Sequence, residues 1–342
     1  MPTRHVALAL LVAVAWGVNF VAIDFSLDTF PPMFLVALRF AVIAIPTVLF
    51  IPRPDVPLRW LIGYGVGFGV LQFAFVYWGM AIGMPAGLAS LVLQASAPFT
   101  VVLSAILLRE RLTGVQVTGI LIAVAGLAVV GWQRAEHAAV APFLLTLAGA
   151  FGWAIGNVSN RRALQDPGAS SGPSRSSSAP SRPSSGVERP FRLMMWMTVI
   201  PPLPMLVVSL IVEGPSEIGE SMRAAGTLDG LPAVVGVIFT AVVATIGGSG
   251  AWTWLMSIHP ASVVAPFSML VPVVGMTTAW VVLGQSVRPM EIAGALLVVG
   301  GVLFGTIRLS RGAQRADGGG EPEHGDADRG HDRDVERATA NL

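Results

Sequence analysis

Two residue types are missing from this chain of 342 residues, and charge is scarce. The absence of cysteine excludes disulfides, thiolate catalysis and metal sites built on cysteine. Lysine is also absent, so all 21 basic residues are arginine, which suggests an arginine-favouring coding bias and says little about mechanism. Charged residues make up only 12% of the chain against 54% apolar residues, and the mean hydropathy is +0.70. This composition argues against a soluble globule and indicates that lipid is the solvent.

Signatures of nucleic-acid binding and of enzymes are missing too. The formal net charge is only +1 and the arginines stand between apolar segments, so no nucleic-acid partner is expected. None of the five histidines stands in a His-Glu-x-x-His arrangement, and there is no Gly-x-Ser-x-Gly motif. We therefore expect no enzymatic activity, no metal and no cofactor. The glycine-rich stretch 63–69 lies inside an apolar segment, where close helix packing is the expected role.

What the chain does contain is a series of membrane-length apolar segments. A spanning helix needs about 20 predominantly apolar residues, because an unpaired backbone group in hydrocarbon costs several kcal/mol. The first segment resembles a signal peptide but is long and lacks a clear cleavage site, so we interpret it as a span. The expected fold is an all-α polytopic membrane protein with ten transmembrane helices at 5–23, 31–51, 60–80, 85–108, 113–132, 139–159, 191–212, 231–256, 261–284 and 290–308.

Part of the chain is duplicated. Residues 85–130 recur without a gap, 175 positions later, as residues 260–305, with matching hydrophobic edges and turns. The identities include glycines, with Gly119 and Gly126 matching Gly294 and Gly301. Five spans per half is an odd number, so the second copy enters the membrane with opposite polarity. The sequence thus predicts two inverted five-helix repeats, an arrangement typical of secondary transporters that work by alternating access.

Arginine placement predicts the orientation of the chain. With a cytoplasmic amino terminus, 17 arginines fall in cytoplasmic segments and only Arg134, Arg223 and Arg288 fall outside. The positive-inside rule then places both termini in the cytoplasm, in the cytoplasmic membrane of a prokaryote. The expected domains are a first repeat at 1–160, a disordered cytoplasmic Ser/Pro/Arg-rich loop at 161–190, a second repeat at 191–310 opened by the sixth helix (139–159), and a disordered cytoplasmic acidic tail at 311–342.

Several motifs resemble one known family. The first span reads Ala-Trp-Gly-Val-Asn-Phe-Val-Ala-Ile at 15–23, and the sixth repeats this as Gly-Trp-Ala-Ile-Gly-Asn at 152–157. The second span carries Leu-Arg-Phe at 38–40, and the fourth ends in Ala-Pro followed by Leu-Leu-Arg-Glu-Arg-Leu at 107–112. Together these resemble EamA-type members of the drug/metabolite transporter superfamily. The chain departs from that pattern at Arg109, where the family usually has glycine, and at Gln285, where it usually has glutamate.

The resemblance implies export or exchange of small metabolites, such as amino acids or related amphiphilic compounds, through a central cavity. The partners expected are therefore a small-molecule substrate and the lipid bilayer, and a homodimer stays open as an assembly. A non-transporting membrane scaffold or a channel-like protein is the alternative. Since no ATP-binding motif is present, we expect gradient-driven transport. The lack of a deep carboxylate or histidine favours a uniporter-like or weakly proton-linked exporter.

Arg39 is the clearest candidate for a substrate contact, because a charge inside a span costs about 2.5–3.5 kcal/mol on insertion scales. Two interpretations stand side by side. Arg39 either bonds backbone carbonyls at helix breaks or meets a substrate carboxylate, and Asp24 is the nearest candidate for a protein partner. The other candidates for cavity lining are Trp16, Asn19, Gln72, Tyr77, Gln94, Trp153, Asn157 and Ser268, and the candidate helix breaks or hinges are Pro98, Pro266 and Pro272.

Overall fold

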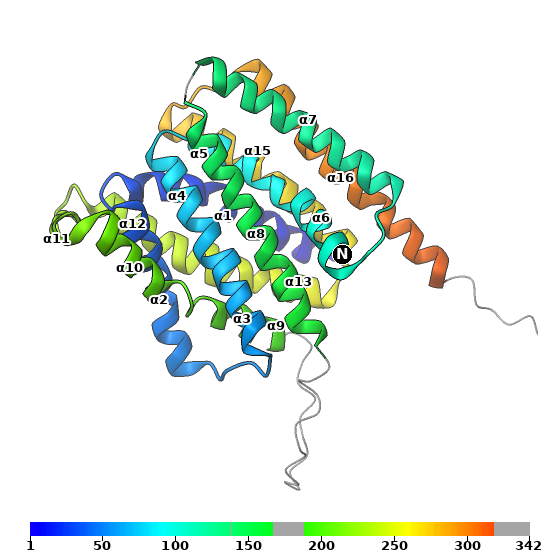
Figure 1. Ribbon diagram of the computed structural model, residues 1–342, viewed down its shortest axis with the longest axis horizontal. Helices are drawn as coiled ribbons and strands as arrows, with labels where there is room; N and C mark the ends of the chain where they lie inside the picture. The colour runs from blue at the N-terminus through cyan, green and yellow to red at the C-terminus, as the bar shows by residue number, and fades with distance from the viewer. Residues whose placement is uncertain (138, 167–187, 318–342) are drawn as a thin grey trace, which may run out of the picture.

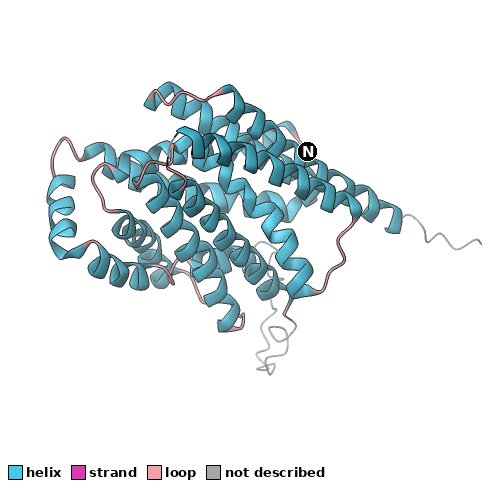
Figure 2. Cartoon of the chain, turned by 45° about the horizontal axis from the view of Figure 1, so that its top comes forward, coloured by secondary structure: helices cyan, strands magenta, loops and turns pink. Residues whose placement is uncertain are grey.

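The computed structural model describes residues 1–137, 139–166 and 188–317, and all regular structure in these ranges is helical (Figure 2). Nine helices there are long and apolar enough to cross a membrane, and the stretch Pro289–Gly305 is a shorter apolar helix. These ten segments coincide with the ten predicted spans, and the predicted all-α membrane fold is confirmed. Most of the predicted 161–190 loop and of the 311–342 tail lies outside the described residues.

The first five spans begin close to the predicted boundaries. The third and fourth are not uniform α-helices, because each contains a segment with a different hydrogen-bond spacing. The spans are α1 (Thr3–Leu27), α2 (Pro32–Phe50), α3 (Leu58–Tyr64) continuing through the π-helical η1 (Gly65–Gln72) into α4 (Phe73–Ala81), α5 (Ala86–Val92) continuing through the 3₁₀ turn η2 (Leu93–Ala95) into α6 (Ser96–Leu108), and α7 (Gly114–His137).

The second five spans repeat this pattern, and an additional helix lies between the seventh and eighth. This helix, α11 (Gly214–Ala225), occupies what the sequence analysis interpreted only as a loop. The spans are α8 (Ala141–Gln165), α9 (Glu188–Met197) with α10 (Pro202–Val212), α12 (Leu231–Ile238) with the π-helical η4 (Phe239–Ser249) and α13 (Gly250–Ile258), α14 (Ala261–Val264) with the 3₁₀ segment η5 (Ala265–Met269) and α15 (Leu270–Leu283), and α16 (Pro289–Asp317).

Backbone irregularities occur at equivalent places in the two repeats. With the offset of 175 residues found in the sequence, the π-helical segment η1 corresponds to η4, and the 3₁₀ turn η2 falls beside η5. Arg109 (φ 55°) and its counterpart Gly284 (φ 66°) are both left-handed and both end a span. Glycine is the residue that tolerates this conformation best, which explains the family's preference for glycine at this position and makes Arg109 a departure at a structurally demanding place.

The repeat glycines bring α7 and α16 into close contact along their length, and Figure 1 shows the two helices side by side. A Cβ on Gly119 would lie 2.6 Å from the Gly301 carbonyl oxygen, and one on Gly126 would lie 2.7 Å from the Gly294 oxygen. Gly119 is equivalent to Gly294 and Gly126 to Gly301, so each of these two contacts is the counterpart of the other in the second repeat. A local twofold axis therefore runs between the fifth and tenth spans, and only glycines allow the backbones to approach this closely.

Helices from the two repeats are interleaved. The first span packs against the eighth and ninth, through α12, η4 and α15, whereas the sixth span packs against the third and fourth, through η1, α4 and α6. The glycines of 63–69 make the second of these contacts close, since a Cβ on Gly67 would lie 2.5 Å from the Gly156 nitrogen. The close packing predicted for this stretch is confirmed. Each of these two groups of packed spans thus contains helices from both repeats.

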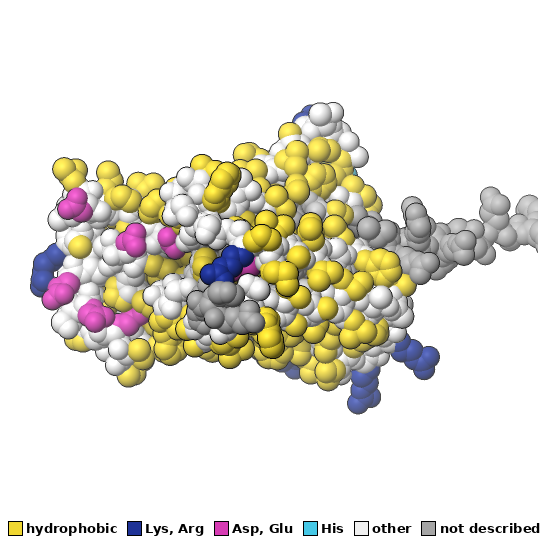
Figure 3. All heavy atoms as spheres, turned by 90° about the horizontal axis from the view of Figure 1, so that it is seen from above, with side chains coloured by type: hydrophobic (Ala, Val, Ile, Leu, Met, Phe, Trp, Pro, Cys, Tyr) yellow, Lys and Arg dark blue, Asp and Glu magenta, His cyan; other side chains and the backbone are white. Residues whose placement is uncertain are grey.

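Contacts at the helix ends define two faces. We call the end that holds the start of α1 the N-terminal face, and the other end the opposite face. His5 contacts His259 on the first of these, whereas the backbone of Met33 and Phe34 contacts Glu213 on the second. When ten spans alternate in direction, the start of the first span and the end of the eighth fall on one face, and the start of the second and the end of the seventh fall on the other. The acidic residues gather at the end where α11 lies (Figure 3), which is the opposite face.

Candidate functional site

A buried guanidinium lies at the centre of the bundle. Arg39 on α2 is 2% exposed and donates from Nη1 to the Tyr77 hydroxyl (2.5 Å) and from Nη2 to the Thr245 hydroxyl (2.8 Å). Its charged carbon stands 4.1 Å from the centre of the Phe73 ring. We call Arg39, Phe73, Tyr77 and Thr245 the Arg39 cluster. The cation is therefore held by two neutral oxygens and an aromatic face.

The charge of Arg39 has no counterion in the part of the chain that the structure describes. No carboxylate there lies within ion-pair distance of it, and the guanidinium contacts Tyr77 and Thr245 instead of the expected partner Asp24. Its Nε atom is buried and meets no protein acceptor. A buried charge without a partner costs several kcal/mol, so a site that keeps one is suited to an anionic ligand.

The π-helical segment η4 shapes the second half of this cluster. The Thr245 hydroxyl donates to the Thr240 carbonyl five residues earlier (2.8 Å), which leaves its oxygen lone pairs to accept from Arg39. One residue away, the Ala244 carbonyl accepts the indole N–H of Trp16 (2.9 Å). Segments of this kind free backbone groups and occur frequently at functional sites. One interpretation from the sequence was that Arg39 bonds a backbone carbonyl. Instead, Arg39 donates to the Thr245 hydroxyl, which in turn donates to the Thr240 carbonyl.

Aromatic rings connect the cluster to the sixth span. Phe73 packs against Phe68 with centroids 5.7 Å apart, and Phe68 meets the edge of Trp153 at 5.9 Å. On the other side, Trp16 lies 5.1 Å from Trp252. Trp252 is therefore a packing residue, whereas Trp254 is 38% exposed. Trp16 and Trp153, which the sequence predicts to line a cavity, thus each pack against another aromatic ring.

The predicted amide side chains are placed differently from one another. The Asn19 Oδ1 and Gln72 Oε1 atoms are buried and have no protein partner. In contrast, Asn157 donates from Nδ2 to the Thr100 hydroxyl (3.1 Å), which joins α8 to α6. Gln94 Nε2 contacts the sulfur of Met269 at 3.4 Å. Asn19 and Gln72 therefore retain acceptors for a ligand, while Asn157 acts as an interhelical contact.

Gln94 and Met269 are equivalent positions of the two repeats, and their contact places them at the local twofold axis. Ser268, beside Met269, donates to the Ala265 carbonyl within η5 (2.7 Å). The predicted prolines flank the same region: Pro98 lies just after the 3₁₀ turn η2, Pro266 lies in η5, and Pro272 lies at the start of α15. Irregular backbone thus surrounds the axis, and the side-chain bonds of Gln94 and Ser268 go to Met269 and Ala265 rather than to the Arg39 cluster.

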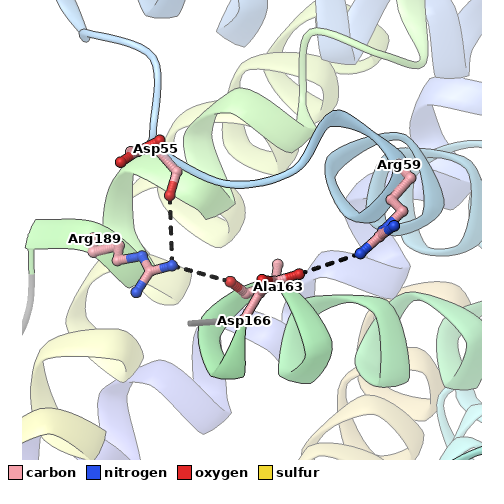
Figure 4. A network of polar contacts seen from close by, with 5 residues as sticks. All are labelled: Asp55, Arg59, Ala163, Asp166 and Arg189. Atoms are coloured by element: carbon pink, nitrogen blue, oxygen red, sulfur yellow. Dashed lines mark hydrogen bonds and ion pairs between the residues drawn. The ribbon is translucent and has the colours of Figure 1, made fainter. Parts of the chain in front are cut away.

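The N-terminal face is closed in this structure. His5 Nδ1 and His259 Nε2 lie 2.7 Å apart, and beneath them Ala9, Leu255 and Val264 are fully buried against one another. Further along this face, Arg59 pairs with Asp166 (3.4 Å), and Arg189 donates to the Ala163 and Asp55 carbonyls (Figure 4). Contacts between the third, sixth and seventh spans therefore close this face as well.

The cavities identified in the described part of the chain lie at the opposite face. One, of about 590 Å³, lies between the α1–α2 connection and α11, and is lined by Trp78 and by the acidic side chains of Asp28, Glu213, Glu217 and Glu220. A smaller one of about 240 Å³ lies beside Pro85 and Gln285. Neither includes Arg39 or Tyr77. The Arg39 cluster is therefore buried away from both cavities, and the larger of the two lies beside the acidic residues of the opposite face.

Two members of the Arg39 cluster were missed in the sequence. Phe73 resembles any apolar residue of a span, and Thr245 has no charged neighbour and corresponds to Val70 in the other repeat. Arg39 and Thr245 are 206 positions apart, so no local pattern connects them. The sequence feature that could have identified Thr245 is a hydroxyl inside an apolar stretch. Other residues share this feature, such as Thr47 and Thr146, and their hydroxyls bond only to their own helix.

Comparison with known proteins agrees with this architecture. The chain is 42% identical over 297 residues to a protein of Salmonella typhimurium named "Probable amino-acid metabolite efflux pump", covering 86% of this chain and 92% of the relative. It is 39% identical over 311 residues to an Escherichia coli protein of the same name, covering 90% and 97%. A solved crystal structure with 19% sequence identity matches the fold with a TM-score of 0.55 and covers 91% of this chain.

The family model described as "EamA-like transporter family" matches residues 3–132 and again residues 184–307. Two matches in one chain agree with the duplication seen in the sequence, the equivalent helix irregularities and the glycine contacts. The resemblance drawn from the span motifs is confirmed, and the chain belongs to the EamA-like transporter family.

Proposed function

We propose that this transporter exports amino acids or related amphiphilic metabolites by alternating access, with Arg39 binding the substrate carboxylate. One observation carries the proposal: a buried guanidinium with neutral partners, a free Nε and no described counterion lies at the centre of a duplicated bundle. A carboxylate would supply the missing negative charge, and arginine binds carboxylates through two parallel hydrogen bonds. The names of the two bacterial relatives support the same substrate class.

The other predicted residues have roles in this proposal. Unpaired amide oxygens at Asn19 and Gln72 are suited to accept hydrogen bonds from a substrate ammonium group. Trp16 and Trp153 provide apolar walls for the remainder of an amphiphilic molecule. Gln94 and Asn157 contact neighbouring spans, Ser268 bonds within η5, and the segments at Pro98, Pro266 and Pro272 act as hinges. Because one chain contains the whole Arg39 cluster, a homodimer would contain two complete sites.

Arginine distribution supports the orientation. The N-terminal face carries Arg59, Arg161 and Arg189, whereas the opposite face carries Glu213, Glu217 and Glu220. By the positive-inside rule the N-terminal face would be cytoplasmic, and both termini with it. In the cytoplasmic membrane of a prokaryote, the occluded site described above would then have its larger open cavity on the external side.

Counterflow in proteoliposomes tests the function. Vesicles loaded with one unlabelled amino acid at a time are diluted into the same labelled amino acid, with methyl esters as controls that lack the carboxylate. We expect exchange of some free amino acids but not of their esters. Arg39→Ala should abolish it while the protein still folds, whereas Arg59→Ala, which removes an exposed arginine, should not. Activity lost only in proportion to folded protein would indicate a structural role for Arg39.

Energy coupling is proposed to be uniporter-like or only weakly linked to protons. In the described spans, the Arg39 cluster contains no carboxylate or histidine to carry a proton with the substrate. Imposing a pH gradient across the vesicles should therefore change the steady-state accumulation little. Strong accumulation driven by the gradient and abolished by an uncoupler would refute this part of the proposal.

A further inference from the structure

The smaller cavity at the opposite face is lined by two opposite charges that do not pair with each other. It measures about 240 Å³ and lies where the loop 285–288 meets the starts of the fourth and tenth spans. Arg288 and Glu291 both line it. Within the described ranges neither side chain forms an ion pair, although the two residues are only three positions apart. The cavity therefore offers a guanidinium and a carboxylate to a bound molecule.

The carboxylate of Glu291 is nearly buried and keeps one oxygen available. The residue is 5% exposed, and its Oε2 accepts from the Arg288 backbone N–H (2.9 Å) just before α16 begins. Its Oε1 accepts no hydrogen bond from the residues that the structure describes. Taking a carboxylate out of water costs several kcal/mol unless a cation or several donors compensate it. An oxygen left open in a cavity is therefore suited to a cationic group.

The first repeat shows that this helix end needs no charge. Glu291 is equivalent to Gln116, and Arg288 is equivalent to Thr113. The Gln116 Oε1 atom accepts from the Thr113 N–H at 2.9 Å, the same distance as in the second repeat. A neutral amide thus makes the same backbone contact. The charges at 288 and 291 occur only in the second repeat, so capping does not account for them.

The rest of the lining is apolar on one side and polar on the other. Leu88 from the fourth span and Met276 from the ninth provide the apolar side, whereas Gln285 and Ser286 provide an amide and a hydroxyl. The Gly87 N–H contacts Gln285 Oε1 at 3.5 Å, which leaves the Nε2 donors of this amide. The volume equals that of about eight water molecules and is smaller than a drug-sized pocket. It suits a small metabolite with one charged end and one apolar end.

We propose that this cavity is a second binding site, which takes a zwitterionic amino acid with an apolar side chain. Arg288 binds the carboxylate, Glu291 Oε1 accepts from the ammonium group, and Leu88 and Met276 contact the side chain. A zwitterion neutralises both charges at once, whereas a purely cationic or anionic molecule leaves one of them unmatched. The inference goes beyond the proposed function, because the cavity includes no member of the Arg39 cluster and binding there requires no transport.

Equilibrium binding to the purified full chain tests this site. Arg39→Ala serves as the background, because it removes the proposed central site. We expect saturable binding of labelled L-leucine or L-phenylalanine. Phenylalanine methyl ester lacks the carboxylate and phenylpropionate lacks the ammonium group, so each should compete at least roughly tenfold less well than the free amino acid, since bonds to charged groups are the stronger class.

Substitutions in the same Arg39→Ala background assign the site. Glu291→Gln keeps the helix contact, as Gln116 does in the first repeat, and should weaken binding roughly tenfold or more without changing the unfolding midpoint. Arg288→Gln keeps the backbone N–H and should act alike, which provides a second variant if Glu291→Gln folds poorly. Glu217→Gln, in the larger cavity of the same face, is the control and should bind normally.

Three results would overturn the proposal. The first is an absence of saturable binding of both amino acids in the Arg39→Ala background. The second is unchanged affinity in Glu291→Gln and Arg288→Gln. The third is a methyl ester that competes as well as the free amino acid, because it would indicate a simple cation site in which Arg288 has no part.

Failure of this site and failure of the proposed function are distinguishable. If no amino acid exchanges in counterflow, while binding in the Arg39→Ala background depends on Glu291, the proposed function is wrong and the second site stands. If exchange depends on Arg39 while Glu291→Gln and Arg288→Gln bind like their parent, the function stands and the second site is refuted.

Discussion

Adjacent glycines on α16 provide a sharp test of the close contact between the fifth and tenth spans. A Cβ on Gly301 would lie 2.6 Å from the Ala123 nitrogen and 2.7 Å from the Gly119 oxygen, whereas a Cβ on Gly300 would meet nothing within 4 Å. Both neighbours of Gly301 are backbone atoms, which cannot rotate away. Replacing each glycine with alanine therefore adds the same methyl group to two contrasting environments.

The size of the effect follows from these distances. Ordinary contact between such atoms begins at 3.4 Å, so Gly301→Ala forces the helices apart, and overpacking of this kind costs about 1–3 kcal/mol. Alanine is the better helix former by about 0.5–1 kcal/mol in water, a gain that Gly300→Ala receives without a clash. Both variants share this gain, so their free energies of unfolding should differ by the overpacking cost of about 1–3 kcal/mol, with Gly301→Ala the less stable.

Thermal or denaturant unfolding of the purified transporter in detergent measures this difference, with the parent and both variants examined under one condition. We expect the midpoint for Gly301→Ala to fall and that for Gly300→Ala to stay level or rise. Equal midpoints for the two variants would refute the close backbone contact between α7 and α16 and, with it, the local twofold axis at that place.

Three further predictions concern the ends of the helices. Cysteines at His5 and His259, whose ring nitrogens lie 2.7 Å apart, should be joined by a short bifunctional thiol reagent that stops exchange, while either single cysteine should exchange normally after the same treatment. Arg109→Gly should raise the free energy of unfolding by about 0.5–1 kcal/mol, because the left-handed position no longer holds a side chain; an unchanged unfolding midpoint would contradict this. Glu213→Gln should lower stability by about 1 kcal/mol, since the carboxylate accepts from the Met33 and Phe34 N–H groups at the start of α2; Glu217→Gln, which has no such contact among the described residues, is the control, and equal unfolding curves would remove this role.

The sequence by itself determined the number of spans, their helical conformation and the duplication, but not the additional helix α11. Lipid leaves backbone groups no partner outside the segment, so a run of about 20 apolar residues must become a helix whatever its neighbours are. The turns at Arg109 and Gly284 and the glycines of the repeat could be located for a related reason. Positive φ and close backbone approach are local demands that glycine meets best, and they leave a mark on residue identity.

Tertiary structure alone decided what Arg39 contacts and which spans pack together. The bonds from Arg39 to Tyr77 and Thr245 connect positions 38 and 206 residues apart, and the second depends on a π-helical segment that no residue pattern announced. Partners of a buried charge are chosen by packing among all ten helices, because several hydroxyls and carbonyls are chemically adequate. The sequence could thus identify a costly arginine, while only the folded bundle shows that its charge meets neutral oxygens from the third and eighth spans.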